Sequence, residues 1–111
     1  MTSEEKIGQL QLFEQNLHSI MNQKQQFQSQ QMEIENALSE LEKTQQDVYK
    51  IIGNIMVLQK CDSVKQELQS RQELVTLRLQ SLTKQEDHIK EKVTLLQQEI
   101  METMSTTNGS H

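Results

Sequence analysis

Apolar residues recur every three or four positions along the first forty residues of the chain. From Leu10, steps of three and four alternate over ten positions, and eight of the ten residues are apolar. A repeat averaging 3.5 residues keeps one face of a helix turned toward a partner helix. Thr2 and Glu5 have the spacing of a capping box, so we predict a helix over about residues 4–45. The seam positions are Leu10, Phe13, Leu17, Ile20, Lys24, Phe27, Gln31, Ile34, Leu38 and Leu41.

A second seam of the same kind fills the C-terminal half. It starts at Leu68, and again eight of its ten positions are apolar. Ser63 and Gln66 have capping-box spacing, which predicts a helix over about residues 63–104. The small polar residues 105–111 predict a disordered tail. The seam positions are Leu68, Gln72, Val75, Leu79, Leu82, Glu86, Ile89, Val93, Leu96 and Ile100.

The segment between the two seams, about residues 47–60, has a different pattern. Two runs rich in β-branched residues flank the pair Gly53-Asn54, which is typical of a β-hairpin with a primed two-residue turn. In this register Ile52 lies opposite Ile55, and Gly53 takes the position that needs a positive φ. The alternative interpretation is a buried helical segment that bridges the two seams.

A reversal at Gly53-Asn54 brings the two seams together. Residues whose numbers sum to about 109 or 110 then face each other, and apolar residues meet apolar residues along the seam. Lys24 falls opposite Glu86, so two polar seam residues of opposite charge are predicted to form a pair that fixes the register. The sequence therefore predicts a mainly α fold of one domain, residues 1–111: an antiparallel two-helix coiled coil with a central β-hairpin.

The predicted hairpin is apolar on most of both faces. An isolated hairpin is marginally stable in water, and its two edges carry unpaired N–H and C=O groups. We therefore expect hairpins of several subunits to pair into a closed sheet or β-barrel base. Leu74 and Leu77 lie off the seam near this end and are assigned to further subunit contacts. The hairpin residues expected in the interface are Val48, Tyr49, Ile51, Ile52, Gly53, Ile55, Met56, Val57 and Leu58.

The opposite end of the predicted helix pair is rich in large apolar side chains. Some belong to the seam and would simply close the helix pair, which is the competing interpretation for each of them. Others lie off the seam, and methionine adapts to varied apolar partners. Exposed apolar side chains at this end are available for contacts with other chains through nonspecific apolar burial. The candidates are Ile7, Leu10, Leu12, Phe13, Leu17, Leu95, Leu96, Ile100, Met101 and Met104.

Composition and charge exclude several classes of function. The 111 residues have no Pro, three Gly, 33% hydrophobic residues and a net charge of −5. Without a basic cluster or aromatic platform, nucleic-acid binding is not expected. No apolar run approaches a membrane span, and the polar N-terminal residues do not resemble a signal peptide. A single cysteine, Cys61, fits a reducing compartment, most simply the cytosol.

Few side chains offer catalytic or metal-binding chemistry. His18 and His88 could be neighbours in the paired helices, but no third ligand accompanies them, so both are expected to be solvent-exposed. Cys61 has no histidine near it in sequence and is expected to be structural. No Gly-rich phosphate loop is present. We therefore predict a protein that is not an enzyme and needs no cofactor or metal.

The middle segment resembles a known family. Residues 47–58, Asp-Val-Tyr-Lys-Ile-Ile-Gly-Asn-Ile-Met-Val-Leu, lie between two long coiled-coil helices as in the β-type subunit of prefoldin. The Val-Tyr-Lys-x-x-Gly core is the most specific part. The opening of the second helix at residues 64–68 and the stretch 84–86 are also similar. The resemblance covers about residues 7–104, and one hairpin rather than two indicates the β type.

The resemblance implies a function and a set of partners. Prefoldin is an ATP-independent co-chaperone, a hexamer of two α-type and four β-type subunits whose hairpins build a double β-barrel. Its coiled coils hold non-native polypeptides at their tips and pass them to the cytosolic group II chaperonin. The resemblance therefore implies that the ten apolar candidates given above bind clients. The alternative is a structural coiled-coil tether or scaffold without chaperone activity, in which the middle segment is a linker.

Overall fold

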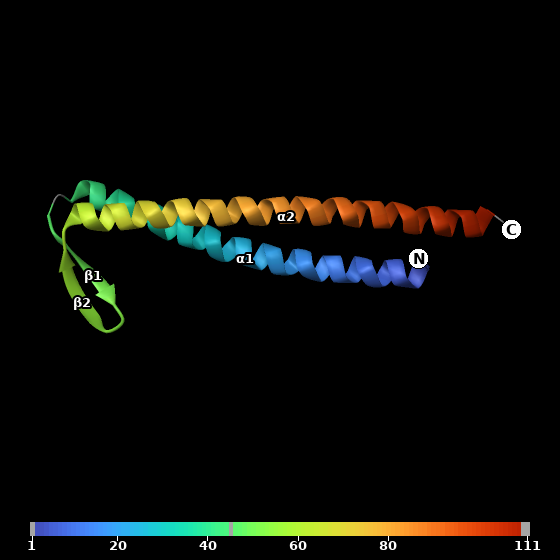
Figure 1. Cartoon of the computed structure of the whole chain (residues 1–111), viewed down its shortest axis with the longest axis horizontal. Coiled ribbons are helices and arrows are strands. Elements are labelled where there is room, and N and C mark those ends of the chain that lie inside the picture. Colours follow the sequence, from blue (N-terminus) through green and yellow to red (C-terminus); the bar gives the residue numbers. More distant parts are fainter. Residues whose placement is uncertain (1, 45, 110–111) are drawn as a thin grey trace. The chain divides into compact units, whose positions relative to one another are not determined.

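The computed structural model describes residues 2–44 and 46–109. Four elements follow one another: helix α1 (Ser3–Lys43), strand β1 (Val48–Ile52), strand β2 (Ile55–Gln59) and helix α2 (Cys61–Gly109) (Figure 1). The predicted fold class is confirmed, since two long helices flank a two-stranded antiparallel hairpin. The chain forms two compact units, residues 1–25 with 80–111 and residues 26–79, which are described separately below.

Helix α1 starts where the capping box predicts. The backbone N–H of Glu5 donates to Thr2 Oγ1, and the N–H of Thr2 donates to Glu5 Oε2, both at 3.2 Å. Together these two hydrogen bonds satisfy two backbone donors that would otherwise be unpaired at the start of the helix. The helix ends at Lys43, two residues before the predicted end at residue 45, which lies outside the described residues.

Helix α2 is longer at both ends than the sequence predicts. It begins at Cys61 rather than residue 63, because the carbonyl of Lys60 already accepts the N–H of Val64, at 3.2 Å. It continues through residues 105–109, which were expected to be a disordered tail. Serine and threonine do not interrupt a helix as Pro does, and the first glycine in this stretch is Gly109, where the helix ends. Residues 110 and 111 of the predicted tail lie outside the described residues.

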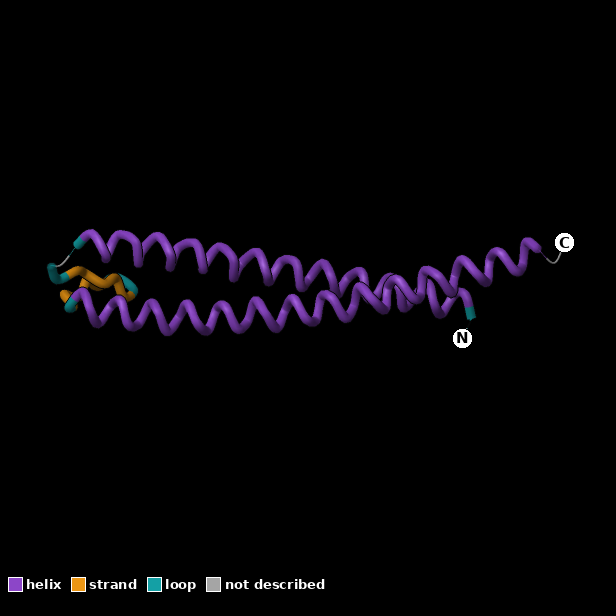
Figure 2. The backbone as a smooth tube through the Cα atoms, turned by 90° about the horizontal axis from the view of Figure 1, so that it is seen from above, coloured by secondary structure: helices purple, strands orange, loops and turns teal. Residues whose placement is uncertain are grey.

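The hairpin has the predicted register. Ile52 pairs with Ile55, Lys50 with Val57 and Val48 with Gln59. Gly53 has a φ of 61°, and no other described residue has a positive φ. A positive φ at the first turn position alone is the pattern of a type II′ turn, which suits the twist of a hairpin. The alternative of a helical bridge is therefore wrong. The hairpin connects the end of α1 to the start of α2 and extends to one side of these two helix ends (Figure 1), which it overlaps in projection in Figure 2.

The predicted seams are the protected faces of the helices. All twenty predicted seam positions are buried or half-buried. In the unit of residues 1–25 and 80–111 the buried apolar residues are Ile20, Leu82 and Leu96. In the unit of residues 26–79 they are Ile34, Leu41, Cys61 and Val75. A narrow seam of this kind is enough to hold helices together where a globular core is missing.

Candidate functional site

The hairpin presents one exposed apolar face. Side chains alternate along each strand, so the cross-strand pairs Tyr49–Leu58 and Ile51–Met56 lie on the same side of the sheet. All four side chains are exposed. Soluble monomers rarely expose contiguous large apolar residues, so such a face indicates a contact surface.

The other face of the hairpin is partly covered. Val48, Lys50 and Val57 are half-buried there, while Ile52 and Ile55 beside the turn remain exposed. The ammonium of Lys50 forms a salt bridge and hydrogen bond with Glu67 of α2. This contact ties β1 to α2 and leaves the opposite, apolar face of the hairpin open to solvent. This contact could not be predicted from the sequence, because Lys50 and Glu67 are 17 residues apart and follow no short-range spacing rule.

The Lys50–Glu67 contact makes stability depend on acid pH. The hydrogen bond from Lys50 lowers the pKa of Glu67 below its ordinary value of 4.5. A carboxyl group with a lowered pKa stabilises the fold above its ordinary pKa, and this contribution is lost as the pH falls through the lowered pKa. We expect Glu67→Gln to melt below the unsubstituted chain at pH 7 and to match it at pH values well below 4.5. Thermal unfolding followed by circular dichroism at both pH values checks this, and a constant difference would contradict it.

Cys61 joins the two helix ends that flank the hairpin. Its buried thiol lies 3.3 Å from the carbonyl oxygen of Thr44 and 3.6 Å from that of Leu41, so the S–H can donate to the end of α1. The last carbonyls of a helix otherwise lack partners within the helix. This supports the prediction of a structural rather than catalytic thiol.

Lys24 and Glu86 meet as the sequence predicts. Lys24 Nζ lies 3.5 Å from Glu86 Oε1, and the side chain of Glu86 is only 12% exposed. Lys90, one turn further along α2, also reaches this oxygen, at 3.3 Å. A charge pair inside an apolar seam costs desolvation but penalises helix registers that would separate the charges.

The pair is therefore expected to specify alignment more than stability. We predict that the double substitution Lys24→Leu and Glu86→Leu raises the melting temperature while allowing additional registers or oligomers. Cross-linking of cysteines placed along both helices, together with native mass spectrometry, measures this. If the double variant keeps one register and one oligomeric state, Lys24 and Glu86 have no such role.

The distal unit, residues 1–25 and 80–111, contains all ten predicted client-binding residues. Leu96 is buried and Leu10, Phe13, Leu17 and Ile100 are half-buried, so these five contribute to helix packing. The other five are exposed: Ile7, Leu12, Leu95, Met101 and Met104. The exposed members are therefore the ones available to another chain without separation of the helices.

Two polar contacts of the distal unit were missed at the sequence level. Lys92 lies over the ring of Phe13, with its Nζ 5.7 Å from the ring centre, and Lys6 Nζ lies 3.6 Å from Glu99 Oε2. Lys92 is one helical turn from Leu96, the predicted partner of Phe13. The predicted register could therefore have placed Lys92 near Phe13. The long stem of a lysine covers apolar surface while its ammonium stays in water.

The two histidines considered as metal ligands in the sequence analysis are not part of a metal site in the described residues. His18 and His88 are both exposed. Within residues 2–44 and 46–109, no three His, Cys, Asp or Glu side chains are grouped as a metal site requires. No helix in this part of the chain is both long and apolar enough to span a membrane.

Comparison with known proteins assigns the family. The sequence profile described as "Prefoldin subunit" matches residues 4–106. Prefoldin subunit beta of Pyrobaculum islandicum is 38% identical over 96 residues, covering 85% of this chain and 77% of that protein. Prefoldin subunit beta of Methanococcoides burtonii is 37% identical over 102 residues, covering 90% and 87%. The crystal structure of the prefoldin beta subunit from Thermococcus strain KS-1 is similar with a TM-score of 0.86, at 31% identity, covering 91% of this chain and 90% of that one.

These matches extend across both helices and the hairpin, and they agree with the architecture described above. The chain therefore belongs to the prefoldin family as a β-type subunit and has the role of a co-chaperone.

Proposed function

We propose that the chain assembles through its hairpin with α-type and β-type prefoldin subunits, in a hexamer of two α-type and four β-type chains. The observation that carries this proposal is the exposed cross-strand face of Tyr49, Ile51, Met56 and Leu58. In the described residues the sheet has only two strands, so each strand has an edge available for pairing. Edge pairing into a closed β-barrel base would satisfy these edges and bury the apolar face.

Client capture takes place at the distal helix ends. Non-native polypeptides expose apolar side chains, and burial of apolar surface contributes about 25 cal/mol per Å². Ile7, Leu12 and Leu95 are exposed there, as are the flexible side chains of Met101 and Met104. Several weak contacts of this type, supplied by several subunits, would hold a client without sequence specificity.

The captured client then passes to the cytosolic group II chaperonin. In this scheme the chain works in the cytoplasm, without catalysis, nucleotide, metal or cofactor, and without nucleic-acid or membrane contacts. The chain acts as one domain over residues 1–111. The alternative of a tether without chaperone activity is not favoured, because the matched relatives are prefoldin subunits across most of their length.

Co-assembly and client protection test the proposal together. The purified chain is mixed with an α-type prefoldin subunit and its mass is measured by native mass spectrometry. Light scattering then follows the aggregation of guanidinium-denatured citrate synthase diluted into the mixture without ATP. We expect a hexamer of two α-type and four β-type chains that suppresses aggregation. A chain that stays separate from the α-type subunit, or a complex that leaves aggregation unchanged, would contradict the proposal.

A further inference from the structure

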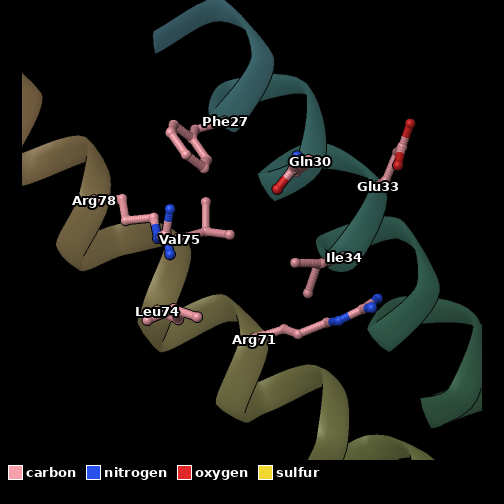
Figure 3. A pocket seen from close by; sticks show the side chains of 8 residues that line it. All are labelled: Phe27, Gln30, Glu33, Ile34, Arg71, Leu74, Val75 and Arg78. Atoms are coloured by element: carbon pink, nitrogen blue, oxygen red, sulfur yellow. The ribbon is translucent and has the colours of Figure 1, made fainter. Parts of the chain in front are cut away.

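The unit of residues 26–79 contains a groove along one side of its helix pair. The groove has a volume of about 490 Å³ and is lined by both helices (Figure 3). Phe27 and Ile34 of α1 face Val75 of α2 along its floor (Figure 3). Leu74, beside Val75 on α2, is exposed, and we assign it below to a client segment in place of the subunit contact expected from the sequence. Ile34 and Val75 are buried in the helix pair, so Leu74 supplies the exposed apolar surface of the groove. This surface belongs neither to the hairpin nor to the distal unit.

Arg71 and Arg78 flank Leu74 along α2, one helical turn away on each side. Arg71 and Arg78 are the only arginines in the chain, and they are one heptad apart, so they lie on the same side of α2 about 10 Å from each other. Arg78 lies over the ring of Phe27, 5.6 Å from its centre, which holds the guanidinium in place. Stacking uses the face of a guanidinium and leaves its N–H edge free to donate.

Neither guanidinium group forms a salt bridge within the described part of the chain, although the charge of Arg71 contributes to the lowered pKa of Glu67. No carboxylate there lies within 4.0 Å of either one. Glu67, one turn before Arg71, is bonded to Lys50 instead. Glu33 lines the groove from α1, but its carboxylate points away from α2 (Figure 3). The two strongest bidentate donors of the chain therefore remain available to carboxylates from outside.

The negative charge of the rest of the chain makes the two arginines the favoured place for an acidic segment to bind. With a net charge of −5, most of the surface repels acidic segments. Arg71 and Arg78 reverse this locally, and between them lies an exposed leucine. A segment with two carboxylates about one heptad apart and apolar side chains between them matches this pattern in both charge and spacing.

We propose that the groove around Arg71, Leu74 and Arg78 binds acidic amphipathic segments of non-native client polypeptides. The inference rests on the proposed client binding and adds a preference for one class of segment to it. Carboxylates of the segment bind the two guanidinium groups, and its apolar side chains pack on the exposed Leu74. The groove would thus select among clients, whereas the exposed apolar residues of the distal unit would not.

Synthetic peptides provide the test. A fluorescein-labelled amphipathic peptide has two glutamates one heptad apart with leucines between them, and a matched peptide has lysines in place of the glutamates. Fluorescence anisotropy measures the binding of each to the full chain. We expect the glutamate peptide to bind about tenfold more tightly at low salt, with the difference reduced at high salt. The double variant Arg71→Gln and Arg78→Gln should remove the difference.

Control variants separate the groove from general electrostatics. The double variant Lys60→Gln and Lys84→Gln changes the net charge equally at two exposed lysines outside the groove, so its preference should be unchanged. The double variant Arg71→Lys and Arg78→Lys retains charge without the bidentate fork and should give an intermediate preference. Circular dichroism verifies that each variant is folded.

Three results would overturn the inference: equal binding of the two peptides, a preference that survives in the Arg→Gln variant, or a preference lost in the Lys→Gln control. Self-association of the free chain that the Arg→Gln variant abolishes would also overturn it, because the groove would then bind a second copy. Aggregation assays keep the proposed function separate. If a complex without any peptide preference still protects denatured citrate synthase, the groove inference fails and the proposed function stands.

Discussion

Replacing Ile51 and Met56 by serine is expected to abolish co-assembly with α-type subunits while leaving the helix pair folded. The two side chains are a cross-strand pair on the exposed face of the hairpin. Their truncation therefore removes little packing within the chain itself. In the proposed assembly both side chains are buried, and full burial of a large apolar side chain contributes about 1.5–3 kcal/mol.

The expected loss is about 3–6 kcal/mol for each subunit, which weakens association by roughly two to four powers of ten. Native mass spectrometry of the mixture with an α-type subunit measures this loss, and circular dichroism checks that helix content is retained. Met32 supplies a matched control, since Met32 and Met56 are both 64% exposed but only Met56 lies on the hairpin. Met32→Ser should assemble normally. Full assembly of the Ile51→Ser and Met56→Ser double variant would show that this face is not the interface.

Serine in place of Leu12, Leu95, Met101 and Met104 is expected to remove most client protection and to spare assembly. These four side chains are exposed in the distal unit, which does not include the strands. Because they are already in solvent, their replacement costs the free chain little apolar burial. A bound client loses up to about 1.5–3 kcal/mol of apolar contact at each fully buried position. The aggregation assay should therefore need at least tenfold more of the variant complex for equal protection.

A pair of methionine variants controls for chemistry and helix propensity. Met101→Ser with Met104→Ser and Met21→Ser with Met32→Ser each replace two exposed helical methionines. Only the first pair lies at the proposed client site, so only the first should reduce protection. If both pairs reduce it equally, client contact is spread along the helices. If neither the quadruple nor the double variant loses protection, the distal side chains do not hold clients.

The elements of the fold follow from local rules and so could be predicted from the sequence. The 3.5-residue seam requires only spacing, and every predicted seam position is protected from solvent. Gly53-Asn54 set the turn and thereby the strand register, which in turn placed Lys24 opposite Glu86. The prediction of one reversal thus contained both the strand register and the Lys24–Glu86 pair.

The missed features depend on side-chain geometry or on weak end effects. The ends of α2 differed because Lys60 already accepts a helical hydrogen bond and because the polar residues after 104 lack a strong helix breaker. The Lys50–Glu67 bridge and the position of Arg78 over Phe27 depend on the rotation of the elements about their axes. Spacing along the chain does not specify these rotations. Among the client-site candidates, burial separates Leu96 from its exposed neighbours, which the pattern alone could not do.

The central claim assigns subunit contacts to the hairpin and client contacts to the exposed side chains Ile7, Leu12, Leu95, Met101 and Met104 of the distal unit. Photo-cross-linking with a diazirine analogue of methionine tests both parts in one sample, because Met21, Met32, Met56, Met101 and Met104 are all exposed in the free chain. The chain is assembled with an α-type subunit, mixed with denatured citrate synthase, irradiated and analysed by peptide mass spectrometry. We predict client adducts at Met101 and Met104, subunit adducts at Met56, and few adducts of either kind at Met21 and Met32. Client adducts concentrated at Met56, or spread evenly over all five positions, would contradict this account.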